Sequence, residues 1–197
     1  HVADFLPITE LAKMVKKTGI DILDEKIFKR KFTQEEIDKL LLEACDGNIL
    51  SLVEYAIKKG ADIHVDKESC LKKACVKGYA DIAELLIRNG ADVNIDDGFC
   101  LSSACFLGVF DVVKVLVENG ADIRGKYDLP ISRASERGHV EIVRYLIKNG
   151  AGVDGYKGSP LLNSIKYGHF EVIKCLIDNG ANVSIEDESP LKEAISR

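Results

Sequence analysis

Histidine and nucleophilic side chains are where an enzymatic or metal-binding function would show in this sequence. His139 and His169 each follow a glycine, and no third ligand stands at helical spacing from either, as a zinc site would need. His64 is alone in a predicted loop. No serine or cysteine has a histidine and an orienting carboxylate close along the chain, although partners distant in sequence are left open. We therefore predict structural roles for His139 and His169.

Clustered acids and glycines suggest two further chemistries. Asp96-Asp97 and Glu186-Asp187-Glu188 could hold calcium, but acids in predicted loops are more simply explained as solvated charge. The segment at residues 152–155, Gly-Val-Asp-Gly, lacks the spacing of a phosphate-binding loop and has no helix after it. We expect no catalysis, no cofactor and no metal, so the chain is predicted not to be an enzyme.

A short segment, first found as Lys59-Gly60-Ala61-Asp62-Ile63, recurs along the chain. Its glycine returns with a period of 30 residues, at Gly60, Gly90, Gly120, Gly150 and Gly180. Such a period indicates stacked supersecondary units, because each unit buries its apolar side only against its neighbours.

Each unit is predicted to contain two helices joined by a tight turn. In the second unit Leu71 and Ala74 mark the buried side of the first helix, and Gly78 ends it. Leu86 lies on the apolar side of the second helix, which Gly90 ends. Both glycines stand where a left-handed cap is needed.

The N-terminal residues 1–34 fit the period poorly and are predicted to form a helical cap or a degenerate repeat. An amphipathic helix is indicated by the spacing of Ile8, Leu11, Ala12 and Val15. Thr33 and Glu36 have the spacing of a capping box, which predicts the start of a regular array. We assign residues 35–197 to this array, as five full repeats and a partial C-terminal repeat.

The six cysteines follow the same period. Cys45, Cys75 and Cys105 share one register, and Cys70 and Cys100 share another. Equivalent helices of stacked units lie ~8–10 Å apart, beyond the ~7 Å limit for a disulfide, and no pair has CxxC spacing. We expect free, mostly buried thiols in a reducing compartment.

Composition narrows the class of partner. The 197 residues are 46% hydrophobic and carry a formal net charge of −5. General binding to nucleic acid or to an anionic membrane needs a basic field, so neither is expected as a partner. No apolar run approaches the ~20 residues of a membrane span, and no secretory signal opens the chain, so we expect a cytoplasmic protein.

Two motifs carry a resemblance to a known family. Residues 159–164, Ser-Pro-Leu-Leu-Asn-Ser, are a divergent form of the motif Thr-Pro-Leu-His-x-Ala. Residues 138–143, Gly-His-Val-Glu-Ile-Val, match the inter-helix segment that is characteristic of the same family. With these motifs in register over residues 35–197, the chain resembles the ankyrin repeat family. The resemblance implies an all-α ankyrin-repeat solenoid of stacked helix-turn-helix units with short connecting loops or hairpins. It also implies that the imidazoles of His139 and His169 form local hydrogen bonds.

The repeats are shorter than the ~33 residues usual for the family. The difference falls between Ile63 and Leu71 and at equivalent points, where the family has its β-hairpin finger, so shortened fingers are expected. Units of this length are similar to those of ankyrin proteins of large amoebal DNA viruses, and intracellular bacteria are an alternative source. Either source would place the protein in the host cytosol.

The family binds other proteins on the concave side, which is lined by loops and first helices. The resemblance therefore implies a non-catalytic, monomeric protein–protein interaction module. The alternative is the substrate-recognition arm of a larger protein, such as a ubiquitin-ligase adaptor. Mapped onto this chain, the loop candidates for binding are Asp66, Phe99, Lys126, Tyr127 and Tyr156. The first-helix candidates are Lys73, Phe106, Arg133 and Tyr167.

Aromatic and arginine residues dominate binding hot spots, which favours these candidates. A second interpretation stays open for Phe99 and Phe106, whose rings could instead fill gaps between units. A further candidate site is Asn94, because residues 86–94, ending in Asp-Val-Asn, resemble ankyrin segments modified by asparaginyl hydroxylases.

Overall fold

The computed structural model describes residues 7–18 and 31–183, except for the side chains of Thr18 and Tyr127. Within these residues the chain forms eleven α-helices and two short 3-10 helices, and no strand. The predicted all-α class is confirmed. The chain divides into two compact units, unit 1 (His1–Asp92) and unit 2 (Val93–Arg197).

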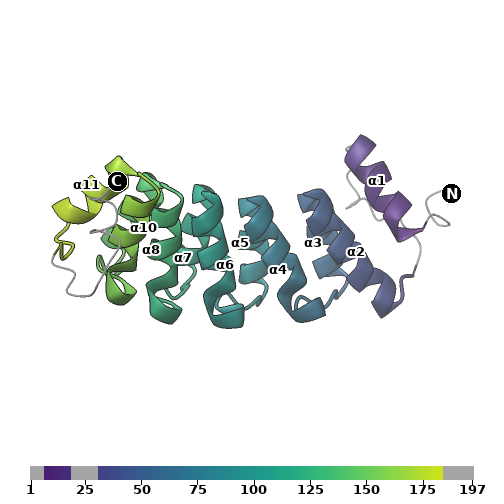
Figure 1. Ribbon diagram of the computed structural model, residues 1–197. Coiled ribbons are helices and arrows are strands. Elements are labelled where there is room, and N and C mark those ends of the chain that lie inside the picture. The colour runs from purple at the N-terminus through teal and green to yellow at the C-terminus, as the bar shows by residue number, and fades with distance from the viewer. Residues whose placement is uncertain (1–6, 19–30, 184–197) are drawn as a thin grey trace. The chain divides into compact units, whose positions relative to one another are not determined.

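Unit 1 consists of a first helix and two helix pairs (Figure 1). Its helices are α1 (Ile8–Thr18), α2 (Gln34–Gly47), α3 (Leu50–Lys58), α4 (Val65–Lys77) and α5 (Ala80–Arg88). Helix α1 packs on α2, and α2 contacts both its partner α3 and the next first helix, α4. The α4–α5 pair repeats this arrangement, with α5 against α3.

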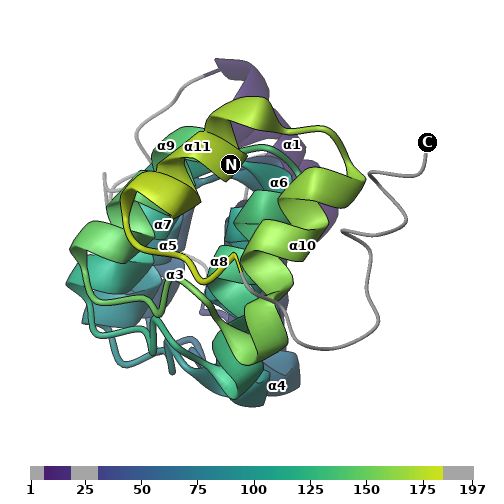
Figure 2. The same ribbon diagram turned by 60° about the vertical axis from the view of Figure 1, so that its left-hand side comes forward.

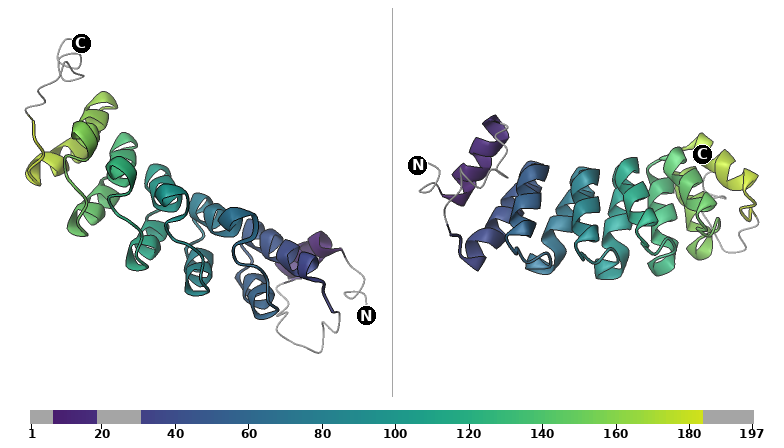
Figure 3. Two further views of the ribbon diagram at one scale, coloured as in Figure 1. Left: turned by 90° about the horizontal axis from the view of Figure 1, so that it is seen from below. Right: turned by 180° about the vertical axis from the view of Figure 1, so that it is seen from behind.

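Unit 2 continues the pattern with three helix pairs. Its helices are α6 (Ile95–Leu107), α7 (Phe110–Glu118), η2 (Lys126–Asp128), α8 (Leu129–Glu136), α9 (Val140–Lys148), η3 (Tyr156–Gly158), α10 (Ser159–Lys166) and α11 (Phe170–Asp178). The first helices α6, α8 and α10 form one layer, and the second helices α7, α9 and α11 form another (Figures 2 and 3). Functional side chains on successive first helices are therefore neighbours.

Local signals in the sequence position these helices as predicted. At the start of α2 the Glu36 amide donates to Thr33 Oγ1 at 3.2 Å, and the Thr33 amide donates to Glu36 Oε2 at 3.0 Å, which confirms the capping box. Asn48, at the end of α2, adopts a left-handed conformation with φ of 56°. The four apolar residues that predicted α1 are all buried: Ile8, Leu11, Ala12 and Val15.

All six cysteines are buried and free, as predicted. Burial raises the pKa of Cys105. A hydrogen bond with the Cys70 thiol, together with burial, raises the pKa of Cys45. These two thiols stand in different registers, on α2 and α4, so the spacing between equivalent cysteines did not reveal their contact. Raised pKa values keep thiols protonated and unreactive.

The segments where fingers were expected form tight turns that lead directly into the first helices. Asp66, Lys67 and Glu68 of α4 all have positive φ, from 50° to 61°, before the helix becomes right-handed. Residues 96–98 of α6 repeat this left-handed turn. Left-handed conformations cost about 1–2 kcal/mol per non-glycine residue, so contacts between repeats must hold these turns.

Side chains at or just before the start of a first helix accept hydrogen bonds from the loop that follows the second helix of the same pair. In unit 1 Asp38 Oδ1 accepts from the Asp62 amide at 2.7 Å, and Glu68 Oε1 accepts from the Asp92 amide at 3.2 Å. Glycine replaces the acid at positions 98 and 158 of unit 2. There the acceptors lie four residues earlier: Asn94 Oδ1 accepts from the Asp122 amide at 2.8 Å, and Asp154 Oδ1 accepts from the Asn182 amide at 2.7 Å.

Candidate functional site

Aromatic and cationic side chains gather where the first helices of unit 2 end. We name Phe106, Arg133, Glu136, Arg137 and Tyr167 the aromatic–arginine cluster. Two guanidinium groups lie over the Phe106 ring, with the Cζ of Arg133 5.5 Å and the Cζ of Arg137 4.9 Å from its centroid. Each distance lies within the range of a cation–π interaction. The ring thereby holds both arginines on one surface.

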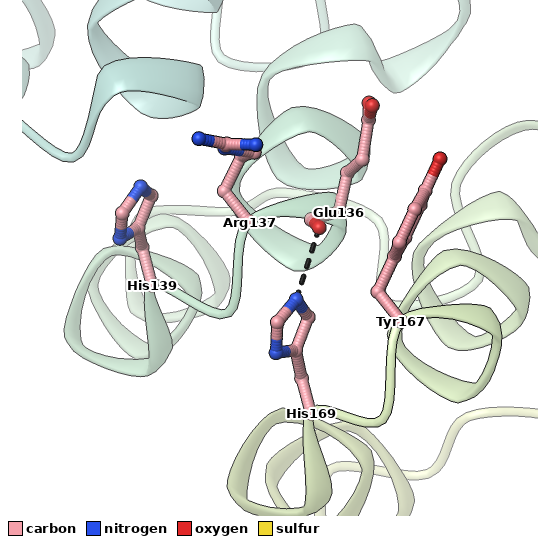
Figure 4. Close-up of a pocket in the computed structure, with 5 residues that line it drawn as sticks. All are labelled: Glu136, Arg137, His139, Tyr167 and His169. Carbon is pink, nitrogen blue, oxygen red and sulfur yellow. Dashed lines mark hydrogen bonds between the residues drawn. The ribbon is translucent and has the colours of Figure 1, made fainter.

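Two histidines fix the helix ends that carry this cluster. His139 Nε2 donates to the Phe106 carbonyl oxygen at 3.1 Å. His169 Nε2 donates to the Glu136 carbonyl oxygen at 3.0 Å (Figure 4). A carbonyl can only accept, so Nε2 carries the proton in both rings. The sequence predicted local hydrogen bonds. That detail is wrong, because each bond crosses to the preceding repeat, 33 residues earlier.

Glycine is needed beside each of these imidazoles. Gly108 and Gly138 have φ of 76°, and a Cβ at Gly108 would lie 2.5 Å from the His139 ring. A Cβ at Gly138 would lie 2.6 Å from the His169 ring. The turn glycine therefore serves two purposes, a left-handed backbone and space for the histidine of the next repeat.

A hollow of about 330 Å³ opens beside the cluster and is lined by Glu136, Arg137, His139, Tyr167 and His169 (Figure 4). The Tyr167 side chain is 49% exposed, and its ring stacks on that of His169 with centroids 6.4 Å apart. Arg133 Nη1 pairs with Glu136 Oε2 at 2.9 Å. The exposed Arg137 has no carboxylate within 4.0 Å among the described residues.

A second hollow, of about 430 Å³, lies at the turns of unit 2 and is lined by Asn94, Asp97, Gly98, Asp122, Gly125 and Lys126. Lys126 Nζ lies 3.6 Å from Asp97 Oδ2. The exposed Asn94 holds the loop that follows α7, because its Oδ1 accepts from the Asp122 amide and its Nδ2 donates to the Gly120 carbonyl at 3.3 Å. The predicted site residues Asn94 and Lys126 therefore belong to this hollow.

Both the sequence and the fold of this chain are similar to those of known proteins. The family model "Ankyrin repeats (3 copies)" matches residues 15–97, 40–127 and 101–187. The chain belongs to the ankyrin repeat family. The crystal structure of the human ASB11 ankyrin repeat domain is similar to it, with a TM-score of 0.70 and 29% sequence identity, over 80% of this chain and 77% of that one. None of the curated proteins compared matches the sequence.

The remaining predicted site residues lie outside the cluster of this ankyrin protein. In unit 2 Tyr156 of η3 is 48% exposed under Lys157, and Phe99 is at the first right-handed turn of α6, not in a loop as predicted. The backbone of Tyr127 lies in η2, and its side chain lies outside the described residues. In unit 1 Asp66 is exposed in the left-handed turn of α4, and Lys73 lies 3.9 Å from Asp46.

The aromatic–arginine cluster thus contains three of the predicted site residues, Phe106, Arg133 and Tyr167. Its other two members, Glu136 and Arg137, were not predicted from the sequence. Arg137 stands four residues after Arg133 on the same helix end and thirty before Tyr167, a signal that could have revealed it. Glu136, three residues after Arg133, was not among the predicted site residues. Phe106 is half-buried beneath the guanidinium groups.

Among residues 7–18 and 31–183, no three His, Cys, Asp or Glu side chains come together as metal ligands. In the same residues, no helix is both long and apolar enough to cross a membrane.

Proposed function

We propose that this ankyrin repeat protein is a non-catalytic protein–protein interaction module. Its binding surface is the side of unit 2 that carries the first helices and turns, with the aromatic–arginine cluster at its centre. The observation that supports the proposal is the pair of guanidinium groups held on Phe106 beside the half-exposed Tyr167. Burial of a tyrosine or arginine at the centre of an interface contributes about 2 kcal/mol or more to binding.

The second helices offer a contrasting surface. Their outward positions carry long charged side chains such as Arg88, which pairs with Glu84 at 2.5 Å, and Lys114, which pairs with Asp111 at 2.7 Å. Exposed ion pairs contribute about 0–1 kcal/mol. This surface is therefore proposed to remain solvated, while Lys126, Tyr127 and Tyr156 extend the binding surface along the turns, and Phe99 joins them from α6. Asp66 and Lys73 are proposed as contacts of unit 1.

Site-directed photo-crosslinking tests the proposal. A p-benzoyl-phenylalanine residue is placed at position 167 in one variant and at position 174, on the outward side of α11, in the matched control. Each is irradiated in a lysate of the organism that makes the protein, and adducts are identified by mass spectrometry. A protein adduct specific to position 167 is expected. Equal adducts at both positions, or adducts at position 174 alone, would contradict the proposal.

The alternative function is the substrate-recognition arm of a larger protein such as a ubiquitin-ligase adaptor, which would use the same surface. Similarity to the ankyrin repeat domain of human ASB11 supports the ankyrin-repeat fold that such an arm would use. If the protein is an adaptor, its expression should lower the abundance of the crosslinked partner, and a proteasome inhibitor should restore it. If the abundance of the crosslinked partner does not change, the adaptor function is rejected and the simple interaction module is retained.

Further proposals concern the state of the protein. We propose a cytoplasmic monomer, and the six buried free thiols support a reducing compartment. The 30-residue period supports a grouping with the short-unit ankyrin proteins of large amoebal DNA viruses, which would place it in the host cytosol. Light scattering after gel filtration should give the mass of one chain, 21.7 kDa.

Asn94 is proposed as a substrate for an asparaginyl hydroxylase. It is exposed at the start of α6, where an enzyme can reach its Cβ, but its two hydrogen bonds to the loop that follows α7 must open first. Incubation with such an enzyme followed by peptide mapping should show a gain of one oxygen on Asn94. An unmodified Asn94 beside a modified control array would reject this proposal.

A further inference from the structure

Charge around the aromatic–arginine cluster is opposite in sign to that of the chain. Arg133 is neutralised by Glu136 at 2.9 Å, while Arg137 and the exposed Lys166 add positive charge. Lys166 itself lies over the Tyr167 ring, with its Nζ 5.3 Å from the centroid. The whole chain has a net charge of −5, so this local excess of cations is a specific feature of the surface. An anionic group of a partner is favoured here.

Arg137 is the group best prepared to receive that anion. Its guanidinium is held over Phe106 at 4.9 Å, so much of the conformational entropy that a free arginine loses on binding is already lost. Stacking on a ring uses the face of the guanidinium and leaves the N–H groups at its edge to donate. A planar fork of donors matches a carboxylate, which can accept two parallel hydrogen bonds.

Apolar side chains stand on either side of Arg137 in the same register of the repeat. Leu107 ends α6 one repeat earlier and is 46% exposed, and Tyr167 follows α10 one repeat later and is 49% exposed. The surface is therefore a row of three positions, apolar, cationic and apolar, each thirty residues from the next. Packed helices lie about 8–10 Å apart, a distance that a polyproline II segment spans in about three residues, and its period of three keeps every third side chain on one face.

From this row we infer that the partner binds through an extended acidic segment. An aspartate or glutamate pairs with Arg137 in the hollow, and an apolar residue about three positions away on each side contacts Leu107 and Tyr167. A phosphate group fits less well, because the Glu136 carboxylate lines the same hollow and would repel a dianion. This inference rests on the proposed function, since it names the chemistry of the partner at that surface.

Peptide selection supplies the test. A phage library of random twelve-residue peptides is selected on the full chain, and enriched sequences are synthesised with each acidic residue intact or replaced by its amide. Affinities are measured by calorimetry for the wild type, for Arg137→Gln and for the control Arg144→Gln, which removes an exposed arginine from α9. Circular dichroism checks that each variant is folded.

The expected peptides carry an acidic residue flanked by apolar residues about three positions away. Arg137→Gln and the amide peptide should each weaken binding at least tenfold, and combining them should cause little further loss, because both remove the same contact. Arg144→Gln should change Kd less than twofold. Selected peptides without an acid, acidic peptides that bind Arg137→Gln as tightly as the wild type, or displacement by millimolar inorganic phosphate alone would overturn the inference.

Failure of the inference is distinguishable from failure of the proposed function. If binding is lost in Tyr167→Ala and retained in Arg137→Gln, the cluster binds protein without an acidic contact, and only the inference fails. If position 167 crosslinks no protein and no selected peptide is sensitive to any cluster variant, the proposed function fails and the inference fails with it. Self-association of the chain, abolished by Arg137→Gln, would instead overturn the proposal of a separate partner.

Discussion

The imidazole of His139 donates a hydrogen bond of 3.1 Å from Nε2 to the main-chain carbonyl oxygen of Phe106, in the preceding repeat. His169 makes the same bond to Glu136 one repeat later, at 3.0 Å. These bonds satisfy carbonyl groups at the ends of α6 and α8, which lack partners within their own helices. The residues that carry the proposed binding surface are therefore fixed by the residues that join the repeats.

Replacement of His139 tests this connection. Val109 occupies the equivalent position one repeat earlier, so His139→Val introduces a residue that the register accepts. Loss of the hydrogen bond should lower the free energy of unfolding by about 1 kcal/mol. Urea unfolding measures the change, with the exposed Lys148→Ala as control. Unfolding curves that coincide for the His139 variant and the wild type would show that the bond does not stabilise the fold.

The turn glycines should differ in their tolerance of alanine. Gly138→Ala places a Cβ 2.6 Å from the His169 ring, whereas at Gly168 no described atom lies within 4 Å, although its φ is also positive at 73°. Gly168→Ala should cost only the left-handed strain of about 1–2 kcal/mol, and Gly138→Ala should cost about 1 kcal/mol more through the lost hydrogen bond.

Calorimetric melting compares the two glycine variants. Combining Gly138→Ala with His169→Ala should remove the clash and make the glycine replacement about as costly as Gly168→Ala. Equal destabilisation by the two single variants would mean that the imidazole moves aside freely.

Ser135 is a serine in a register where other repeats have cysteine. Its hydroxyl is fully buried and has no hydrogen-bond partner among the described residues, and three other repeats place cysteine in this register. Ser135→Cys should raise the free energy of unfolding by about 1 kcal/mol, because an unsatisfied hydroxyl is replaced by a small apolar group. Urea unfolding provides the measurement.

The matched control for Ser135 is Ser164→Cys. Ser164 is also fully buried, but its Oγ donates to the Leu161 carbonyl at 2.8 Å, so its replacement should give no gain. A loss of stability in Ser135→Cys would indicate that its hydroxyl has a partner after all.

Equivalent positions were predictable from the sequence, and contacts between different positions were not. The period located the helices and turns because Gly78, Leu86 and their counterparts recur in register. It could not show that Cys45 meets Cys70, or that His139 reaches Phe106, because such contacts depend on how one repeat rotates against the next. The candidate site was predicted in part for the same reason: aromatic and arginine residues are recognisable by type and register, while the position of the Arg137 guanidinium over the Phe106 ring depends on how the repeats pack.

The pairing of His64 with Glu68 predicts a pH dependence of stability. His64 Nδ1 lies 2.5 Å from Glu68 Oε1, and this hydrogen bond, then the negative charge of Glu68, raises the pKa of the histidine above 6.5. A raised pKa in the folded state means that the charged form stabilises the fold. That stabilisation is complete below the unfolded pKa of 6.5 and is lost as the pH rises through the raised value.

Denaturation at two pH values and NMR titration check this pair. The wild type should exceed His64→Gln in stability by more at about pH 6 than at about pH 8.5. These values lie below and well above the ordinary histidine pKa of roughly 6.5. The volume-conserving Glu68→Gln should return the pKa of His64 toward its ordinary value. A wild-type His64 that titrates below 6.5 would contradict the account.

The central claim is that the aromatic–arginine cluster is the surface that binds the partner. It is tested most directly by calorimetric titration of the protein captured at position 167. Arg137→Ala combined with Tyr167→Ala should weaken binding at least tenfold, or ~1.4 kcal/mol, while the melting temperature changes little, because both side chains are exposed. The control pair Arg144→Ala with Lys174→Ala, on the outward side of α9 and α11, should leave Kd within about twofold, or ~0.4 kcal/mol. Loss of binding in the control pair with full binding in the cluster pair would contradict the claim.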